Sequence, residues 1–265
     1  MSSAALALLG LLPPTAYLAT VAAWHAHAHR RYQQVTGSSG PPAHVHAAEW
    51  RRKWRLRRWQ ALGALPTPTH LEGRRVVLVH GFLARAAFWR GLQHTLHHRG
   101  RPTTAVELGW PLGGVDSYVP ALRDAVQGDQ PVDVVTHSMG GLVLRAALRD
   151  HPPLRPMVRS VITLGTPHHG TEAARGLPAH LPRDLGDLQP DSAYLQALPP
   201  LPELLPHARR HAVAAVHDIV AFPPERVLPP GMQHHVLHAL GHNGLLTEPR
   251  VHHLIGSLLH DPSLG

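Results

Sequence analysis

The residue with the strongest chemical context in this sequence is Ser138. It follows the β-branched run 132–136 and precedes Gly140 and Gly141. A strand, a sharp turn and a helix in this order lift a serine hydroxyl off the edge of a sheet, where it can act as a nucleophile. The second residue after the serine must be small, because strand and helix pass close together there, and Gly140 satisfies this. The next stretch, 142–149, predicts a helix whose N-terminus favours negative charge beside the hydroxyl.

Two backbone N–H groups are candidates for an oxyanion hole. The apolar stretch 75–80 reads as a buried strand and runs directly into Gly81. Acyl transfer by a serine needs two preorganised donors for the developing oxyanion. We expect one donor to be the N–H of Met139, directly after the serine. The other is the N–H of Phe82, with Leu83 as the neighbouring alternative.

A general base and its acidic partner follow later in the chain. His242 lies in a glycine-containing loop, and Asp218 comes just after the apolar stretch 211–216. Ser138, Asp218 and His242 occur in one of the orders known for a catalytic triad. Other residues of the same types are alternatives at this stage. The competing bases are His234, His235 and His238, and the competing acid is Asp184.

The elements that must position these residues alternate between strand and helix. This alternation predicts an α/β fold with a mainly parallel sheet flanked by helices. Active residues of such sheets gather at the carboxyl ends of the strands, where His80 and Ser138 fall. We expect strands over 75–80, 103–108, 132–136, 158–164 and 211–216, and helices over 89–99, 118–127, 142–149 and 249–259.

The segments around the expected site predict a pocket. The loop 164–171 closes one strand and should lie beside the nucleophile, with His168 shaping the pocket. Leu83 and His137 are the other expected substrate contacts. Residues 170–206 are rich in Pro and Leu and poorly periodic, which predicts a cap or lid over an apolar pocket.

Taken together, these motifs resemble the α/β-hydrolase superfamily, and more narrowly bacterial triacylglycerol lipases and esterases. The likeness covers about 74–259, and Thr136 departs from the glycine usual at that position. It implies a Ser138–His242–Asp218 triad, an acyl-enzyme, a lipid or other carboxylic ester as substrate, and no metal or organic cofactor. The stretches that carry the resemblance are His80–Phe82, Thr136–Gly141, Gly165–Thr171, Asp218–Val220 and Gly241–His242.

Other functions stay open on the same scaffold. The acyl group could pass to an alcohol instead of water, as in an acyltransferase, or the substrate could be a thioester. A non-enzymatic, membrane-tethered binding protein is a third alternative, and it predicts a broken triad. The motifs do not separate the first two from hydrolysis.

The N-terminus differs in character from the catalytic domain expected over 74–265. Residues 1–24 form an uncharged apolar stretch after the first residues, which predicts a membrane anchor, with a cleaved signal or a soluble start as alternatives. We expect 25–73 to be a basic linker rich in His, Arg and Trp. Its alternating His25, His27 and His29 could hold a metal ion, but a low-complexity linker is the simpler interpretation.

The basic and aromatic segment 50–59 suits an anionic membrane surface, and its composition would also suit nucleic acid. Because no nucleic-acid-binding motif accompanies it, we expect no nucleic-acid partner. Basic residues on the C-terminal side of the apolar stretch place the body of the protein on the cytoplasmic side. The sequence therefore predicts a protein of the bacterial inner membrane, with a secreted or cytoplasmic protein as the alternative.

Composition sets further limits. A chain of 265 residues with 43% hydrophobic residues can bury a full core. It has no cysteine, which excludes disulfides and thiolate chemistry. The formal net charge of +8 comes from arginine, because Lys53 is the only lysine. This composition is typical of a GC-rich bacterial genome and does not indicate an oligomeric state.

Overall fold

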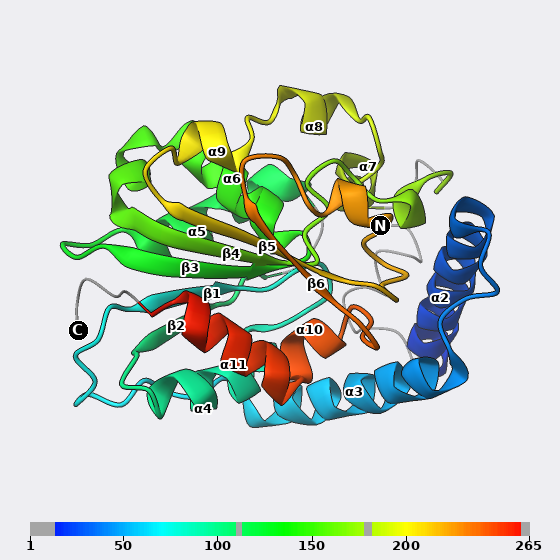
Figure 1. The fold of residues 1–265 in the computed structure, drawn as a ribbon, viewed down its shortest axis with the longest axis horizontal. Coiled ribbons are helices and arrows are strands. Elements are labelled where there is room, and N and C mark those ends of the chain that lie inside the picture. Colours follow the sequence, from blue (N-terminus) through cyan, green and yellow to red (C-terminus); the bar gives the residue numbers. More distant parts are fainter. Residues whose placement is uncertain (1–13, 110–112, 178–181, 261–265) are drawn as a thin grey trace.

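A six-stranded, wholly parallel sheet forms the centre of the protein (Figure 1). The computed structural model describes residues 14–109, 113–177 and 182–260. Strands β1 and β3 are buried at every position, as expected where helices cover both faces of a parallel sheet. The strand order is β2-β1-β3-β4-β5-β6. The strands are β1 (Val76–Val79), β2 (Thr103–Val106), β3 (Val132–His137), β4 (Val158–Leu164), β5 (Arg209–Ala215) and β6 (Gln233–Leu237).

Helices cover both faces of the sheet. Figure 1 shows α4 (Arg90–His97), α10 (Gly244–Thr247) and α11 (Pro249–Leu258) below the sheet, and α5 (Val119–Val126) and α6 (Gly140–Asp150) on its other face. Each face has its own apolar core. The predicted α/β fold is confirmed, and β6, which is not among the five expected strands, completes the sheet. Short 3-10 helices are η1 (Ala86–Trp89), η2 (Val115–Tyr118), η3 (Pro152–Met157), η4 (Glu172–Ala174) and η5 (Pro224–Arg226).

The segment predicted to be a lid folds into three short helices, α7 (Arg183–Asp187), α8 (Ala193–Ala197) and α9 (Leu201–Leu204). The buried Arg145 of α6 joins it to the body. Its guanidinium donates to the carbonyl oxygens of Leu198, Pro199 and His168. The function of this segment as a lid stays a prediction.

The region expected to be a basic linker is helical. It forms α2 (Pro14–Thr36) and α3 (Ala43–Leu62), and α3 runs along the face that also carries α10 and α11 (Figure 1). Arg31 of α2 pairs with Glu172 at 2.7 Å, and Leu56 of α3 is buried in the core beneath the sheet. Helices anchored in this way are part of the folded body and are not a flexible connector.

The anchor predicted over 1–24 lies largely outside the described residues, since only the part from Pro14 onward belongs to α2. Among the residues that the structure describes, no helix combines the length and the apolar character that crossing a bilayer requires. The boundary predicted near Arg74 stays a prediction.

Candidate active site

Ser138 occupies a strained turn at the carboxyl end of the central strand β3. Its φ is 55°, in the left-handed region that residues with a side chain rarely adopt. The Ser138 N–H donates to the carbonyl of Leu164 at the end of β4 (2.9 Å), and α6 begins two residues later. A Cβ on Gly140 would stand 2.6 Å from the carbonyl oxygens of Val79 and His80. The predicted need for a small residue at this position is therefore explained by the approach of β1.

The backbone around Gly81 lies directly against the serine. A Cβ on Gly81 would stand 2.6 Å from Ser138 Cβ and 3.1 Å from its Oγ. Within the described part of the chain, the N–H groups of Phe82 and Met139 donate no hydrogen bond. Met139 follows Ser138 directly, and Phe82 follows Gly81, which lies against the serine. Neither N–H is engaged by another acceptor among the described residues, and their role as oxyanion donors stays a prediction.

His80 fixes the peptide that carries the Phe82 N–H. Its Nδ1–H donates to the carbonyl of Gly81 (2.9 Å), and its Nε2 accepts from the N–H of Leu108 (3.1 Å). Nε2 also lies 3.4 Å from Oε1 of Glu107, so the ring is held on both sides. The Gly81 carbonyl and the Phe82 N–H point in opposite directions across one planar peptide, so this bond orients the N–H as well.

His242 and Asp218 form a hydrogen-bonded pair. The Nδ1–H of His242 donates to Asp218 Oδ2 at 2.7 Å, and Asp218 Oδ1 accepts the N–H groups of Val220 and Ala221 at 2.8 Å each. Since a carboxylate only accepts hydrogen bonds, Nε2 of the imidazole is left as a free acceptor. A Cβ on Gly165 would lie 3.2 Å from both Asp218 Oδ2 and His242 Nδ1, so this glycine leaves room for the pair.

The loop that carries His242 is held by α3, in a contact that could not be expected from the sequence. Glu49 of α3 accepts three backbone N–H groups with its carboxylate, and these belong to Gly241 (3.3 Å), Asn243 (2.9 Å) and Gly244 (3.1 Å). Arg52, one turn further along α3, pairs with the same carboxylate at 3.0 Å and also with Glu248. Glu49 thus fixes the backbone on both sides of His242, and no local motif could have revealed a contact over this sequence distance.

His137 connects the serine turn to the same loop. It is buried, and its Nε2–H donates to the carbonyl of His242 at 3.2 Å. Burial holds the pKa of His137 well below its usual value, with the neighbouring His242 as a further cause, so this ring is neutral. The imidazole rings of His137 and His242 lie 4.4 Å apart between centroids.

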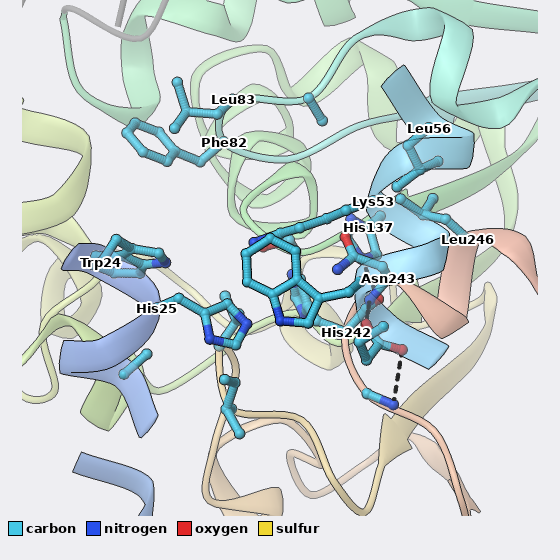
Figure 2. Close-up of a pocket in the computed structure, with 18 of the residues that line it drawn as sticks. Trp24, His25, Lys53, Leu56, Phe82, Leu83, His137, His242, Asn243 and Leu246 are labelled. Carbon is cyan, nitrogen blue, oxygen red and sulfur yellow. Dashed lines mark hydrogen bonds between the residues drawn. The ribbon is translucent and has the colours of Figure 1, made fainter. Parts of the chain in front are cut away.

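A pocket of about 260 Å³ opens beside these groups. Ser138 lines it, as do His242, the predicted oxyanion donor Phe82 and two of the expected substrate contacts, Leu83 and His137. Figure 2 shows these last four residues around the pocket. The lid segment contributes Leu185 and Leu188, and α2 and α3 contribute a wall that includes Trp24, His25, Glu49, Trp50, Lys53 and Leu56. Within the described residues, no hydrogen bond joins Ser138 Oγ to the His242 imidazole, although both side chains line the pocket.

The structure corrects one expected substrate contact. His168 is buried and does not line the pocket, although Pro167 and Thr171 of the same loop do. Its ring turns inward because Nε2 hydrogen-bonds the hydroxyl of Thr163 at 3.1 Å.

The competing acid and bases are placed elsewhere. Asp184 is buried on α7, where burial raises the pKa of its carboxyl, and His242 pairs with Asp218 instead. None of the competing bases lines the pocket: His234 bonds the carbonyl of Pro229, His235 bonds His211, and His238 belongs to the turn after β6.

In the part of the chain that the structure describes, no three metal-ligating side chains converge to form a metal site. His25, His27 and His29 lie on helix α2, so residues two apart point in different directions and do not share the single face expected of an extended strand.

Comparison with known proteins agrees with this arrangement. Residues 116–176 match the family described as PGAP1-like alpha/beta domain. The chain is 32% identical over 113 residues to a triacylglycerol lipase of Pseudarthrobacter phenanthrenivorans, covering 37% of this chain and 34% of that protein. It is equally similar over 113 residues to a triacylglycerol lipase of Burkholderia plantarii, covering 31% of that protein. The matched segment therefore spans about a third of the length of these relatives.

Solved structures extend the likeness to most of the chain. Lipase B of Aspergillus fumigatus has a TM-score of 0.60 at 16% identity, over 77% of this chain and 57% of that one. The mature lipase BlEst2 of Bacillus licheniformis has a TM-score of 0.61 at 15% identity, over 75% of this chain and 96% of that one. The chain therefore has the α/β-hydrolase fold and resembles lipases and esterases that share it.

Proposed function

We propose that this protein is a serine hydrolase that cleaves carboxylic esters, lipid esters among them, through an acyl-enzyme. One observation carries the proposal: Ser138, in its strained turn, and His242, paired with Asp218, line one largely apolar pocket. The named lipases among the relatives support the same class of substrate. An apolar pocket with a few polar groups at one end suits the acyl chain of an ester.

The first half of the reaction forms the acyl-enzyme. Nε2 of His242 takes the proton of Ser138 as the hydroxyl oxygen bonds to the ester carbonyl carbon. The N–H groups of Phe82 and Met139 donate to the oxyanion, and the N-terminus of α6 adds favourable potential. The carbon–oxygen bond to the alcohol then breaks, and the imidazolium gives its proton to the leaving alcohol.

The second half releases the acid. His242 takes a proton from water as the water oxygen attacks the acyl-enzyme, and the Ser138 oxygen leaves with the proton that His242 returns. Asp218 keeps the proton of His242 on Nδ1 and stabilises the imidazolium. The contact between Ser138 and His242 has to shorten when substrate binds, which is common in sites observed without ligand.

The test is hydrolysis of p-nitrophenyl acetate, butyrate and palmitate by the full chain, beside Ser138→Ala. We expect kcat/KM to fall by at least about 10⁴-fold in the variant. Ser257→Ala, on the exposed face of α11, is the matched control and should keep its activity. A fluorophosphonate probe should label the wild type and the control but leave Ser138→Ala unlabelled.

The outcomes separate the alternatives. No turnover and no labelling by a folded wild type would overturn the proposal and favour a binding protein. Labelling with ester formation from added alcohol, in place of acid release, would identify an acyltransferase, and turnover of thioesters alone would identify a thioesterase.

We also propose that α3 contacts an anionic membrane surface, which would place the protein at the bacterial inner membrane. Trp54 is 63% exposed and Leu62 is 65% exposed, and Arg51, Arg55 and Arg58 of the same helix are exposed around them. Indole rings and arginines favour the headgroup region of anionic lipids. Co-sedimentation with phosphatidylglycerol vesicles should fall in Trp54→Ala, and equal binding to phosphatidylcholine vesicles would contradict the proposal.

A further inference from the structure

A single ammonium group stands in the part of the pocket wall that α3 contributes. Lys53, the only lysine of the chain, extends from α3 into the pocket that Ser138 and His242 line (Figure 2). It is half-buried, and its Nζ lies 5.0 Å from the centre of the Trp50 ring. Apart from this cation–π contact, it makes no hydrogen bond or ion pair within the described part of the chain. A cation that is partly removed from water without an acid partner is unfavourable unless a ligand supplies one.

The one acidic side chain of the pocket wall does not supply the missing partner. Glu49 accepts three N–H groups of the His242 loop and pairs with Arg52. Asp218 is buried behind His242 and is likewise engaged by three donors. Both carboxylates are therefore held by other groups.

The other titratable groups of the wall do not offset the charge. Burial lowers the pKa of His25 to about 4, with Lys53 as the next cause, so this ring is neutral near pH 7. His137 and His217 also have lowered pKa values, chiefly because of burial. His46 completes the histidines of this wall, and Arg57 adds a second cation at its rim. Burial lowers the pKa of Lys53 as well, against the opposing effect of Glu49. Among the described residues of the wall, Lys53 is thus a cation for which Glu49, the acidic side chain that lines the pocket, does not serve as a hydrogen-bonded partner.

We propose that the pocket takes esters that carry an anionic group, and that the Lys53 ammonium binds this group while the ester carbonyl lies at Ser138. A carboxylate, phosphate or sulfonate would form a charge-assisted hydrogen bond with Nζ and replace the water that this group loses on burial. The apolar remainder of the wall accepts the hydrocarbon part of the same molecule. This inference rests on the proposed ester hydrolysis and narrows its substrate class.

The anion can belong to the acyl group or to the alcohol, and two matched pairs of esters distinguish them. For the acyl side, mono-p-nitrophenyl glutarate is compared with its neutral methyl ester. For the alcohol side, butyryl glycerophosphate is compared with monobutyrin. The quantity measured is the ratio of kcat/KM for the charged member over the neutral member of each pair.

We expect a charged member to be preferred in at least one pair. Lys53→Met keeps the length of the stem and should lower that ratio by about tenfold, whereas Lys53→Arg should retain most of it. Arg51→Met removes an exposed cation of the same helix that does not line the pocket, and should leave the ratio unchanged. Added salt should lower the wild-type ratio and have less effect on Lys53→Met.

Equal ratios in the wild type and Lys53→Met, in enzymes that hydrolyse the neutral esters and show the same circular dichroism, would overturn the inference. If the folded wild type neither hydrolyses the neutral esters nor reacts with the fluorophosphonate probe, the proposed function itself is overturned. If Ser138 is labelled but neither pair is turned over, the concentrations of each ester that protect Ser138 from labelling give the same ratio. Equal protection by the charged and neutral members would then count against Lys53.

Discussion

The turn that carries Ser138 and the loop that carries His242 reach the same pocket, but different parts of the chain hold them. The Ser138 turn is fixed by its own strand and the two neighbouring strands. Ser138 donates to Leu164, Gly140 packs under the end of β1, and Gly81 lies against the serine. Each of these contacts lies at the end of a strand, where the hydrogen bonds of the sheet restrict movement of the backbone.

The His242 loop has local hydrogen bonds, such as the Gly244 N–H to the Gly241 carbonyl at 3.1 Å, but less support from the sheet. Its strand, β6, lies at the edge of the sheet and is largely exposed. Contacts from distant parts of the chain add to its support: the carboxylate of Asp218 after β5, the ring of His137 and the carboxylate of Glu49 in α3. Steric fit therefore sets the position of Ser138, whereas polar contacts over long sequence distances contribute to the position of His242. Substitutions should therefore damage the two regions differently.

The largest effect is expected from removing the charge that pairs with His242. In Asp218→Asn the amide oxygen keeps the two N–H donors of Val220 and Ala221, so the amide nitrogen faces His242 Nδ1. A donor there forces the imidazole proton onto Nε2, which can then no longer accept the serine proton. We expect kcat for p-nitrophenyl butyrate to fall by about 10³–10⁴-fold.

Fluorophosphonate labelling of this variant should slow in parallel, while its unfolding by urea should show that it remains folded. Unchanged kcat would identify another acid as the partner of the base, and Asp184→Asn is the variant to compare with it.

The Ser138 turn should be the region that tolerates least change in volume. In Gly140→Ala the added Cβ would meet two backbone carbonyl oxygens at 2.6 Å, and neither strand nor helix can move without breaking the sheet. We expect the free energy of unfolding to fall by about 3 kcal/mol, measured by urea denaturation. Gly186→Ala in α7 is the matched control, because nothing lies within 4 Å of its added Cβ, and it should be neutral or slightly stabilising. Equal stability of the two variants would show that the Ser138 turn accommodates an added methyl group and is not held by steric fit.

The same contrast explains what the sequence could predict. The strand, serine and glycine pattern around Ser138 is local, so β3, α6 and the close approach at Gly140 follow from adjacent residues. The acid and base could be ordered along the chain because loop residues after strands meet at one edge of a parallel sheet. His168 was placed wrongly for a related reason: the loop position was correct, but a rotation of the ring toward Thr163 is decided by packing.

The packing of the N-terminal helices α2 and α3 against the body of the protein could not be predicted from the sequence. Arg and Trp are abundant in α3 and alternating His residues occur in α2, and this composition resembles a linker or a membrane-binding segment. Their attachment depends on single long-range contacts, Arg31 with Glu172 and Glu49 with the His242 loop, which leave no periodic signal. Leu56 is buried against the sheet. Because its neighbours in the sequence are mostly arginines, its burial could not be predicted from the local pattern.

Glu49 gives the next smaller effect and tests the support of the base directly. Glu49→Gln leaves one acceptor oxygen where the carboxylate has two, so at least one of the three loop N–H groups loses its partner. A small displacement of His242 should lower kcat by about tenfold with little change in KM. Glu248→Gln is the control, because it removes the other partner of Arg52 but touches none of these N–H groups.

Glu49 is expected to act on catalysis by positioning His242. If it only stabilised the fold, its substitution would change thermal stability and leave kcat unchanged. Loss of thermal stability with an unchanged kcat would show that the contact attaches α3 without affecting the base. Glu49→Asp, which retains the charge on a shorter stem, should recover part of the activity that Glu49→Gln loses.

The smallest expected effect concerns the pH dependence of the helical wall. His25 of α2 packs against Trp50 and His46 of α3, and it faces the charge of Lys53 and the ring of His29. Burial, followed by Lys53, lowers its pKa from 6.5 to about 4 in the folded protein. The folded state therefore favours the neutral ring, so its contribution to stability is present above pH 6.5 and is lost as the pH falls toward 4. Because the ring is only partly buried, we expect the wild type to lose about 1 kcal/mol of unfolding free energy more than His25→Phe over this window, measured by urea denaturation. If both proteins lose the same amount of unfolding free energy, protonation of His25 does not destabilise the folded state.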